Sequence, residues 1–450
     1  MAAAMFVHVS DIHFGQERDH TVHINDDVKA QLIADAAQVV ASLPSKTAQG
    51  ILVTGDIAHS GKKEQFDAAG QWLDALAEAI GCPKHRVQMV PGNHDLDRSK
   101  LSIGGKHLLD HIREGGAKEY EEVIRNPSDR ATLLARFTDY DRFCVGYGCA
   151  LDEEARFATN LRIELAPNRW IRFVRLNSSL LCTGDEGEDV PELMIGARQF
   201  SIPRHTGEEN IVLAHHPLHW YKDAKDVQKY IESRARVFIT GHEHNPRVTV
   251  NKCNDGGDVM MLAAGAAVPF VSNESYTYTY NIIGFDWDEA KDSLLVTIHP
   301  RAWNPENTRF EADNKRLAGD KQEFTLKSPN FRALADVDAG FGALHQNSDS
   351  SPMEPVAELV SAEVIEGFLA PSPLAIEGYE ITMLRFFRDL LESERLRILL
   401  DLRAIPLSSD ERLTQGLERK LFDWLARQGK LPEVISIINK IISERDEGKE

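Results

Sequence analysis

The chain has 450 residues, of which 42% are apolar and 27% charged, which is the composition of a soluble globular protein. A formal net charge of -19 argues against a broad nucleic-acid-binding surface, although bound metal ions can supply positive charge where a phosphate docks. The five cysteines form no CxxC pair, which favours reduced thiols and a cytoplasmic protein. The longest apolar run is too short to span a membrane, and no basic segment of a signal peptide precedes the first apolar run. We therefore expect no membrane association.

The first hundred residues predict three buried strands separated by two helices. Apolar runs at 5–10, 51–54 and 87–90 have the length of strands, and the stretches between them show helical periodicity. Pro44 and Gly81 mark the ends of the two helices. This alternation predicts right-handed crossovers and a mostly parallel sheet.

Residues 97–160 interrupt the alternation. Leu133, Leu134, Phe137 and Phe143 stand at helical spacing, so we expect a helical insertion here. Because the insertion follows a loop with candidate catalytic residues, it is either a lid over the site or a plain helical insertion. The sequence does not separate these two alternatives.

Strands resume after the insertion. Runs at 161–165, 171–176, 211–214 and 237–240 predict strands, and four more follow without intervening helices, at 246–252, 258–264, 278–286 and 293–299. We expect this second half to be an antiparallel extension of the sheet. Residues 300–330 are polar and are expected to wrap around it.

The last part of the chain predicts a separate helical domain. Residues 344–375 are rich in Ser, Pro and Glu, and we predict a linker over 331–376. Residues 377–450 predict a small all-α bundle with apolar stripes along its helices, namely Ile381, Leu384, Phe387 and Leu391, then Leu413, Leu417, Leu421 and Trp424, then Val434, Ile438 and Ile441. The predicted fold is thus an α/β domain over 1–330 followed by this bundle.

Side chains of the metal-ligand type follow five of the predicted strands. They are Asp11, His13, Asp56, Asn93, His215, His242 and His244. Because loops at the carboxyl ends of strands meet in one crevice, the fold should bring these residues together. Nitrogen and oxygen ligands without cysteine suit Mn, Fe, Zn or Co rather than a structural zinc. Two such ions about 3.5–4 Å apart can clamp a phosphoryl group and activate a bridging water.

Two neighbouring residues are the candidate catalytic groups. His94 can donate a proton to a substrate oxygen, and Asp95 can orient and charge that imidazole. The alternative is a polar turn without chemistry. The candidate substrate contacts are His20, Asn177 and Trp220, of which Trp220 either stacks on a base or packs beneath the rim.

The segments Asp11-Ile12-His13, Gly55-Asp56, Gly92-Asn93-His94-Asp95, His215 and Gly241-His242-Glu243-His244 resemble, in order, the calcineurin-like metallophosphoesterase family. The resemblance covers roughly residues 5–330 and implies a β-sandwich flanked by helices. It assigns Asp11, His13, Asp56 and His244 to a first metal and Asp56, Asn93, His215 and His242 to a second. It places His94, supported by Asp95, at the phosphate or the leaving group. His215 is preferred to His216 only because the family's ligand stands two residues before a proline.

Shorter resemblances concern the substrate. Leu176-Asn177-Ser178-Ser179 with Gly196-Ala197-Arg198-Gln199 resembles bacterial phosphodiesterases, whereas the loop from Gly241 to Pro246 is similar to that of DNA-repair exonuclease subunits. The helical tail resembles, more weakly, the death-like effector-associated adaptor domains of bacterial conflict systems. The alternative for the tail is a dimerisation bundle or a C-terminal cap.

Together these features predict a phosphodiesterase with two divalent ions, Mn first and Fe, Zn, Co or Ni as alternatives. It would cleave nucleotide or nucleic-acid phosphodiesters with a metal-bridging hydroxide, as an effector in a bacterial defence system. The alternatives are a metal-dependent DNA nuclease within a complex and a non-catalytic scaffold recruited through its tail. Residues 377–445 are expected to bind a protein partner or a second copy of the chain.

Overall fold

A computed structural model describes residues 4–16, 22–83, 86–184, 186, 191–253, 257–269, 277–317, 322–332, 378–405 and 415–447. Its contacts divide the chain into two units. The first contains Met1–Asp141 and Cys149–Gly340, and the second contains Arg142–Gly148 and Phe341–Glu450. Most of the predicted linker, 331–376, lies outside the described residues, but its first two residues end α9, Pro329–Arg332. Phe331 is fully buried in the core, so the sandwich extends slightly beyond the predicted boundary.

The first sheet has the strand order β12-β11-β10-β1-β2-β3, with β13 paired to β11. Its three predicted N-terminal strands run parallel, and β10 pairs antiparallel with β1. The strands are β1 Ala4–Val9, β2 Gly50–Val53, β3 Val87–Met89, β10 Thr279–Asp288, β11 Ser293–Asn304, β12 Arg309–Ala312 and β13 Glu323–Lys327. The expectation that residues 300–330 only wrap the sheet is wrong, since β12 and β13 both pair with β11.

The second sheet has the order β4-β5-β6-β7-β9-β8. The strands are β4 Arg162–Ala166, β5 Arg169–Arg175, β6 Glu208–Leu213, β7 Ala235–Thr240, β8 Arg247–Lys252 and β9 Asp258–Ala263. The predicted antiparallel extension is wrong for β9, which runs parallel to β7. The chain reaches this position because β8 forms the outer edge and returns antiparallel to β9.

The two sheets pack face to face and form the predicted β-sandwich. Phe6 of β1 contacts Phe173 of β5 and Phe285 of β10, with ring centroids 4.8 and 5.9 Å apart. All three rings are fully buried. Burial of each such ring contributes roughly 2–3 kcal/mol, so this layer is a main source of stability.

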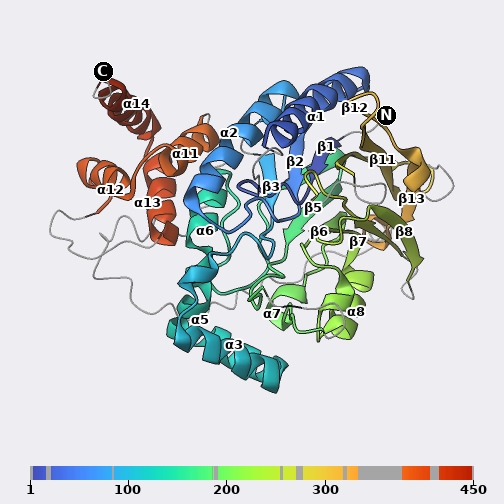
Figure 1. Ribbon diagram of the computed structural model, residues 1–450, viewed down its shortest axis with the longest axis horizontal. Helices are drawn as coiled ribbons and strands as arrows, with labels where there is room; N and C mark the ends of the chain where they lie inside the picture. Colours follow the sequence, from blue (N-terminus) through green and yellow to red (C-terminus); the bar gives the residue numbers. More distant parts are fainter. Residues whose placement is uncertain are drawn as a thin grey trace, which may run out of the picture. The chain divides into compact units, whose positions relative to one another are not determined.

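Helices flank the sandwich on both sides (Figure 1). α1, Val22–Ser42, and α2, Lys63–Ala79, lie beside the first sheet, and the Trp72 indole of α2 donates to the Lys29 carbonyl of α1 at 3.2 Å. α8, Ala224–Arg234, lies against the second sheet through Val227 and Ile231. Each helix thus covers apolar side chains that the strands alone would leave in water. None of the described helices is long and apolar enough to cross a membrane.

The predicted helical insertion contains α3 Ile103–Gly115, α4 Ala117–Arg125, α5 Pro127–Leu134 and α6 Thr138–Gly146. Buried contacts fix it to the loops that follow β5. The Arg136 guanidinium donates to the Leu180 carbonyl at 2.6 Å, and the Tyr120 hydroxyl donates to the Ile195 carbonyl at 3.1 Å. Both side chains are only 1% exposed, which favours a fixed wall over a moving lid.

The C-terminal unit contains α11 Tyr379–Arg388, α12 Glu392–Asp401, α13 Gln415–Arg427 and α14 Leu431–Glu447. Phe386 and Phe422 pack at its centre, with ring centroids 5.1 Å apart. The predicted first stripe is partly wrong, because Ile381 and Leu391 are 61% and 58% exposed while Met383 and Phe386 are buried. The unit also encloses an ion pair at 3.0 Å between Arg395 and Glu418.

Candidate metal centre

The five loops predicted to carry ligands converge at one end of the sandwich. Potential ligand atoms of Asp11, His13 and His244 lie within 4.8 Å of one another, and so do those of Asp11, Asp56 and His215. These residues follow β1, β2, β6 and β7, so the strands place them together although they are far apart in the sequence. The cluster that the sequence predicted is therefore present as a spatial group.

Asp56 lies between two sets of ligand atoms. On one side, the Oδ1 of Asp11 is 3.1 Å from the His244 Nε2, and the Oδ2 of Asp56 is 3.8 Å from the His13 Nε2. On the other side, the same Asp56 oxygen is 3.5 Å from the His215 Nε2. The Asn93 Oδ1 is 3.1 Å from that His215 nitrogen, and the His242 ring centroid is 5.1 Å from the His215 ring centroid. This central carboxylate has the position of a bridging ligand.

His215 and His216 both lie close to His242, and their ring nitrogens have different partners. The Nε2 of His215 faces Asn93 and Asp56, and its Nδ1 donates to the Thr54 carbonyl at 2.7 Å. The His216 Nδ1 instead lies 2.9 Å from the Ser178 hydroxyl. That hydroxyl already accepts the backbone N–H groups of His215 and His216, so its own proton goes to His216. His216 thereby holds the loop behind the ligands.

The ligand loops have an unusual backbone. Five candidate ligands have left-handed φ values, namely Asp11 at 53°, His13 at 52°, Asp56 at 52°, His242 at 71° and His244 at 55°. Each such residue costs of order 1–3 kcal/mol, and such conformations concentrate at functional sites. The loops also approach closely, because a Cβ on Gly92 would lie 2.1 Å from an Asp56 oxygen and one on Gly241 would lie 2.2 Å from the Ser10 hydroxyl. The glycines in the motifs are therefore needed to seat the two carboxylates.

The centre buries negative charge without arginine or lysine. Burial alone would raise the pKa of Asp11, but His244 and His215 lower it to about 2. Asp56 is likewise buried, and its histidine neighbours hold its pKa well below the usual value. Every ion pair that these carboxylates make in the described part of the chain is with a histidine.

The histidines around these carboxylates differ in charge. Burial would lower the pKa of His215, but Asp56 raises it to about 9, whereas burial lowers the pKa values of His13 and His242 to about 4. The buried His13 Nδ1 has no hydrogen-bond partner in the described residues. Two ionised carboxylates, several imidazole nitrogens and an amide oxygen are the donor set of divalent cations, so these residues fit a metal pair.

His94 lies beside this cluster, with its ring centroid 4.9 Å from that of His13. Its Nδ1–H donates to the His59 carbonyl at 2.8 Å, and its ring stacks on the His59 ring at 5.2 Å. The expected support of His94 by Asp95 is wrong: the Asp95 oxygens accept the backbone N–H groups of Ala58 and Gly92, each at 2.8 Å. Asp95 therefore braces the ligand loops, while the His59 carbonyl orients His94.

Comparison with known proteins agrees with this geometry. Residues 4–246 match the family model described as calcineurin-like phosphoesterase. The chain belongs to the calcineurin-like phosphoesterase family. Residues 378–440 match a second model, described as a GTPase-associated adaptor domain, which confirms the expected adaptor character of the tail.

Three individual proteins are similar to this chain at low sequence identity. An uncharacterized metallophosphoesterase-like protein, YydB of Bacillus subtilis (strain 168), is 21% identical over 324 residues, which are 69% of this chain and 62% of that protein. The chain thus spans less than two thirds of this relative. A dimetal phosphatase from Danio rerio is 12% identical, with 73% of this chain and 99% of that chain covered and a TM-score of 0.38. A purple acid phosphatase, PPD1 of yellow lupin, is 12% identical, with 77% and 57% covered and a TM-score of 0.39.

The three candidate substrate contacts have different positions in the structure. His20 lies outside the described residues. Trp220 is at the metal centre, with its ring edge-on to His242 at 4.4 Å and its buried indole N–H without a partner in the described residues.

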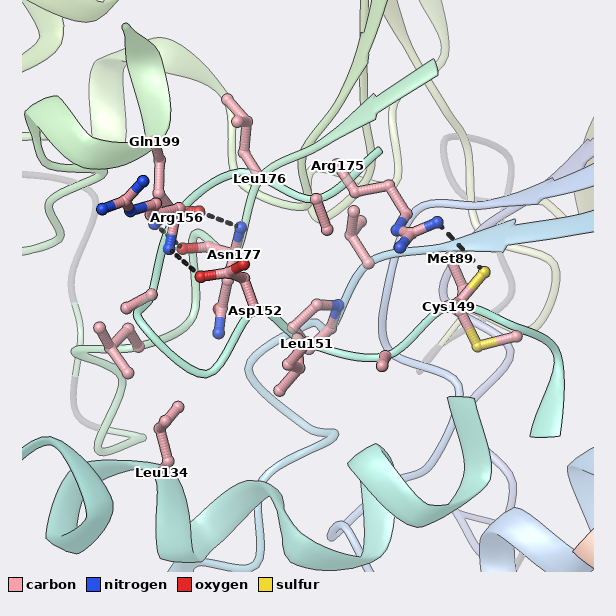
Figure 2. Close-up of a pocket in the computed structure, with 16 residues that line it drawn as sticks. Met89, Leu134, Cys149, Leu151, Asp152, Arg156, Arg175, Leu176, Asn177 and Gln199 are labelled. Atoms are coloured by element: carbon pink, nitrogen blue, oxygen red, sulfur yellow. Dashed lines mark hydrogen bonds between the residues drawn. The ribbon is translucent and has the colours of Figure 1, made fainter. Parts of the chain in front are cut away.

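Asn177 lines a cavity of about 20 Å³ together with Arg175 and Gln199, and none of the seven candidate ligands lines it (Figure 2). Its side chain accepts the Ser179 N–H at 2.9 Å, and the Ser179 hydroxyl donates to the Pro91 carbonyl at 3.0 Å. Asn177 thus belongs to the framework behind the loop of Asn93.

The sequence reasoning did not single out several residues that hold the centre. The Ser10 hydroxyl donates to the Asp11 Oδ2 at 2.5 Å, and Ser178 holds the loop of His215. Arg98 contacts the Asn93 carbonyl at 3.3 Å. Ser10 is adjacent to a ligand in the sequence, which was a usable signal, whereas Ser178 becomes relevant only when β5 and β6 are paired.

Proposed function

We propose that the chain is a phosphodiesterase that uses two divalent cations to cleave nucleotide or nucleic-acid phosphodiester bonds. The observation that carries this proposal is the buried pair Asp11 and Asp56, surrounded by the other five ligand-type side chains and by His94. A structural role alone does not explain two buried carboxylates that have only histidines as counter-charges.

The residues divide into two ligand sets with one member in common. Asp11, His13, Asp56 and His244 would hold one cation, and Asp56, Asn93, His215 and His242 would hold the second. Bound cations would polarise the phosphoryl oxygens and lower the pKa of a water that attacks phosphorus. The left-handed backbone of five ligands supports this assignment, because strain is retained where it presets a binding geometry.

His94 supplies the chain's own proton chemistry in this proposal. Since its Nδ1–H is bound to the His59 carbonyl, the Nε2 is the nitrogen left to face substrate. A protonated His94 donates from this nitrogen to the leaving oxygen, and a neutral one accepts a hydrogen bond there. The stacked His59 ring restricts rotation of the imidazole.

Two features support a diester over a monoester. The carboxylates of the centre form no ion pair with lysine or arginine in the described residues, and a diester carries less negative charge than a monoester dianion. Trp220 stands next to His242 and offers an aromatic ring on which a nucleobase can stack. The residues that match the adaptor model support recruitment of the enzyme to a protein partner through 377–445.

The test compares turnover of bis-p-nitrophenyl phosphate with that of p-nitrophenyl phosphate by the Mn²⁺-loaded full chain. We expect the diester to be preferred by kcat/KM, and labelled single- and double-stranded DNA beside cyclic nucleotides then define the substrate size. A preference for the monoester contradicts the diesterase assignment. Absence of turnover on every phosphoester, with metal bound, favours the scaffold alternative.

A further inference from the structure

Arg98 extends the metal centre outward along one loop. It begins a short 3-10 helix, Arg98–Lys100, which follows the loop that carries His94 and Asp95. Its Nη2 donates to the Asn93 carbonyl at 3.3 Å, while the side-chain oxygen of the same Asn93 faces His215 at 3.1 Å. Asn93 therefore contacts both the Arg98 guanidinium and the cluster of candidate ligands.

Arg98 differs from the other cations of this segment in its partners. The Lys62 ammonium binds Asp97 at 2.7 Å, and Lys100 binds Asp139 at 2.7 Å. Arg98 is exposed and forms no ion pair with a carboxylate in the described part of the chain. Among the described residues, four of its five N–H donors have no acceptor, and the guanidinium fork matches the oxygens of a phosphate.

The opposite loop is shaped around the guanidinium. Gly184 has a φ of 101°, and a Cβ placed on it would lie 2.5 Å from the Arg98 Cζ. The nearby Glu186 does not neutralise Arg98, because it accepts from the Gly184 N–H at 2.8 Å and pairs with Arg113 at 3.1 Å. The glycine therefore leaves room for a guanidinium that lies across its backbone.

We propose that Arg98 is a specificity-determining residue that binds a substrate phosphate adjacent to the one that is cleaved. The inference rests on the proposed phosphodiesterase function and narrows its substrates to those with consecutive phosphates, such as short oligonucleotides. Cyclic mononucleotides and single diesters lack this second group. Arg98 contributes affinity for the neighbouring phosphate, and the metal ligands and His94 act on the reacting one.

The test uses dithymidine monophosphate with no terminal phosphate, with a 5′-phosphate, or with a 3′-phosphate. KM and kcat are measured with the Mn²⁺-loaded full chain, and affinity for the same three compounds is measured by calorimetry. For the wild type we expect one terminal phosphate to lower KM and the dissociation constant by about tenfold. Arg98→Ala should abolish this advantage in KM and in affinity, while Arg98→Lys should retain part of it.

Matched variants separate the role of Arg98 from general damage. Gly184→Ala should displace the guanidinium and reproduce Arg98→Ala, and the double variant should be no worse than either single variant. Gly116→Ala is the control, because Gly116 has a φ of 84° and nothing within 4 Å of an added Cβ. Arg125→Ala removes an exposed arginine from the same insertion and should leave the advantage intact.

The outcomes distinguish this inference from the proposed function. If the wild type gains nothing from either terminal phosphate in KM or affinity, or if Arg98→Ala keeps the gain, the inference is wrong. If no dinucleotide is cleaved but calorimetry shows a gain that Arg98→Ala removes, the phosphate site stands and the phosphodiesterase proposal fails. If the unphosphorylated dinucleotide is cleaved but a terminal phosphate improves neither KM nor affinity, the phosphodiesterase proposal holds and the inference about Arg98 fails.

Discussion

The two ends of β6 and β7 carry buried charge in opposite ways. Where the strands begin, the Glu209 carboxylate pairs with the Arg236 guanidinium at 3.2 Å and also accepts the Asn330 N–H at 3.0 Å. Where they end, the loops carry His215 and His242 toward Asp11 and Asp56, whose ion pairs in the described residues involve only histidines. At the first end, an arginine of the chain neutralises the buried carboxylate. At the second end, we expect bound cations to neutralise Asp11 and Asp56.

This contrast separates structural charge from functional charge. Glu209 and Arg236 are at most 1% exposed and their partners come from several elements, including the Asp258 carbonyl at 3.0 Å. Their removal should therefore affect folding first. Asp11 and Asp56 are equally buried, but their loops also contain the left-handed ligand residues, so their removal should affect chemistry first.

The largest expected effect is the loss of activity in Asp56→Asn. The change removes the charge that lies between both ligand sets, so the bound cations and several kcal/mol of transition-state stabilisation should be lost together. Turnover of bis-p-nitrophenyl phosphate should fall by more than about 10³-fold. Metal content, measured by elemental analysis, should also fall. Unchanged turnover would show that Asp56 does not bridge two catalytic cations.

His94→Ala should have the next largest effect. The variant keeps both carboxylates and all seven ligands, so metal content and melting temperature should match the wild type. The loss of a proton donor should lower kcat by about 10²–10⁴-fold. Asp95→Asn serves as the contrast, since Asp95 contacts backbone N–H groups and should instead lower stability. If Asp95→Asn lowered kcat without lowering stability, Asp95 would act through His94 after all.

At the opposite end, Glu209→Gln should lower the free energy of unfolding by about 3–5 kcal/mol, because it leaves Arg236 buried without a counter-charge. Chemical denaturation measures this change, and activity per folded molecule should stay within about twofold of the wild type. A stable variant with reduced metal content would show that the two ends are not independent.

The smallest effect on catalysis is expected from removal of the tail. Truncation near Ser351 deletes the helices that match the adaptor model. Turnover of a small diester should remain nearly unchanged, whereas partner binding or self-association should be lost, as measured by pull-down and light scattering. Loss of catalysis with unchanged association would show that the tail completes the phosphoesterase instead.

The grouping of the candidate ligands could be predicted from the sequence because each candidate follows an apolar run that forms a strand. Asp56 after β2 and His215 after β6 are examples, and the order of the motifs resembled a known family. Strand pairing was harder to predict, since β9 joins β7 in parallel and β12 and β13 add to β11 through non-local contacts.

Adjacency in the sequence was also a poor guide to side-chain contact. Asp95 follows His94 directly, yet its carboxylate binds the backbone of Ala58 and Gly92. Similarly, helical spacing alone selected Ile381, whose side chain is 61% exposed in the C-terminal bundle. Hydrogen bonds that cross between loops, such as Ser178 to His215, depend on the fold and leave no local pattern.

The most direct test of the account is the location of metal ions by anomalous diffraction from crystals grown with Mn²⁺. We expect two peaks, one among Asp11, His13 and His244 and one among Asn93, His215 and His242, with Asp56 between them and His216 outside both. A single peak, or peaks held by His216 in place of His215, would contradict the proposed centre.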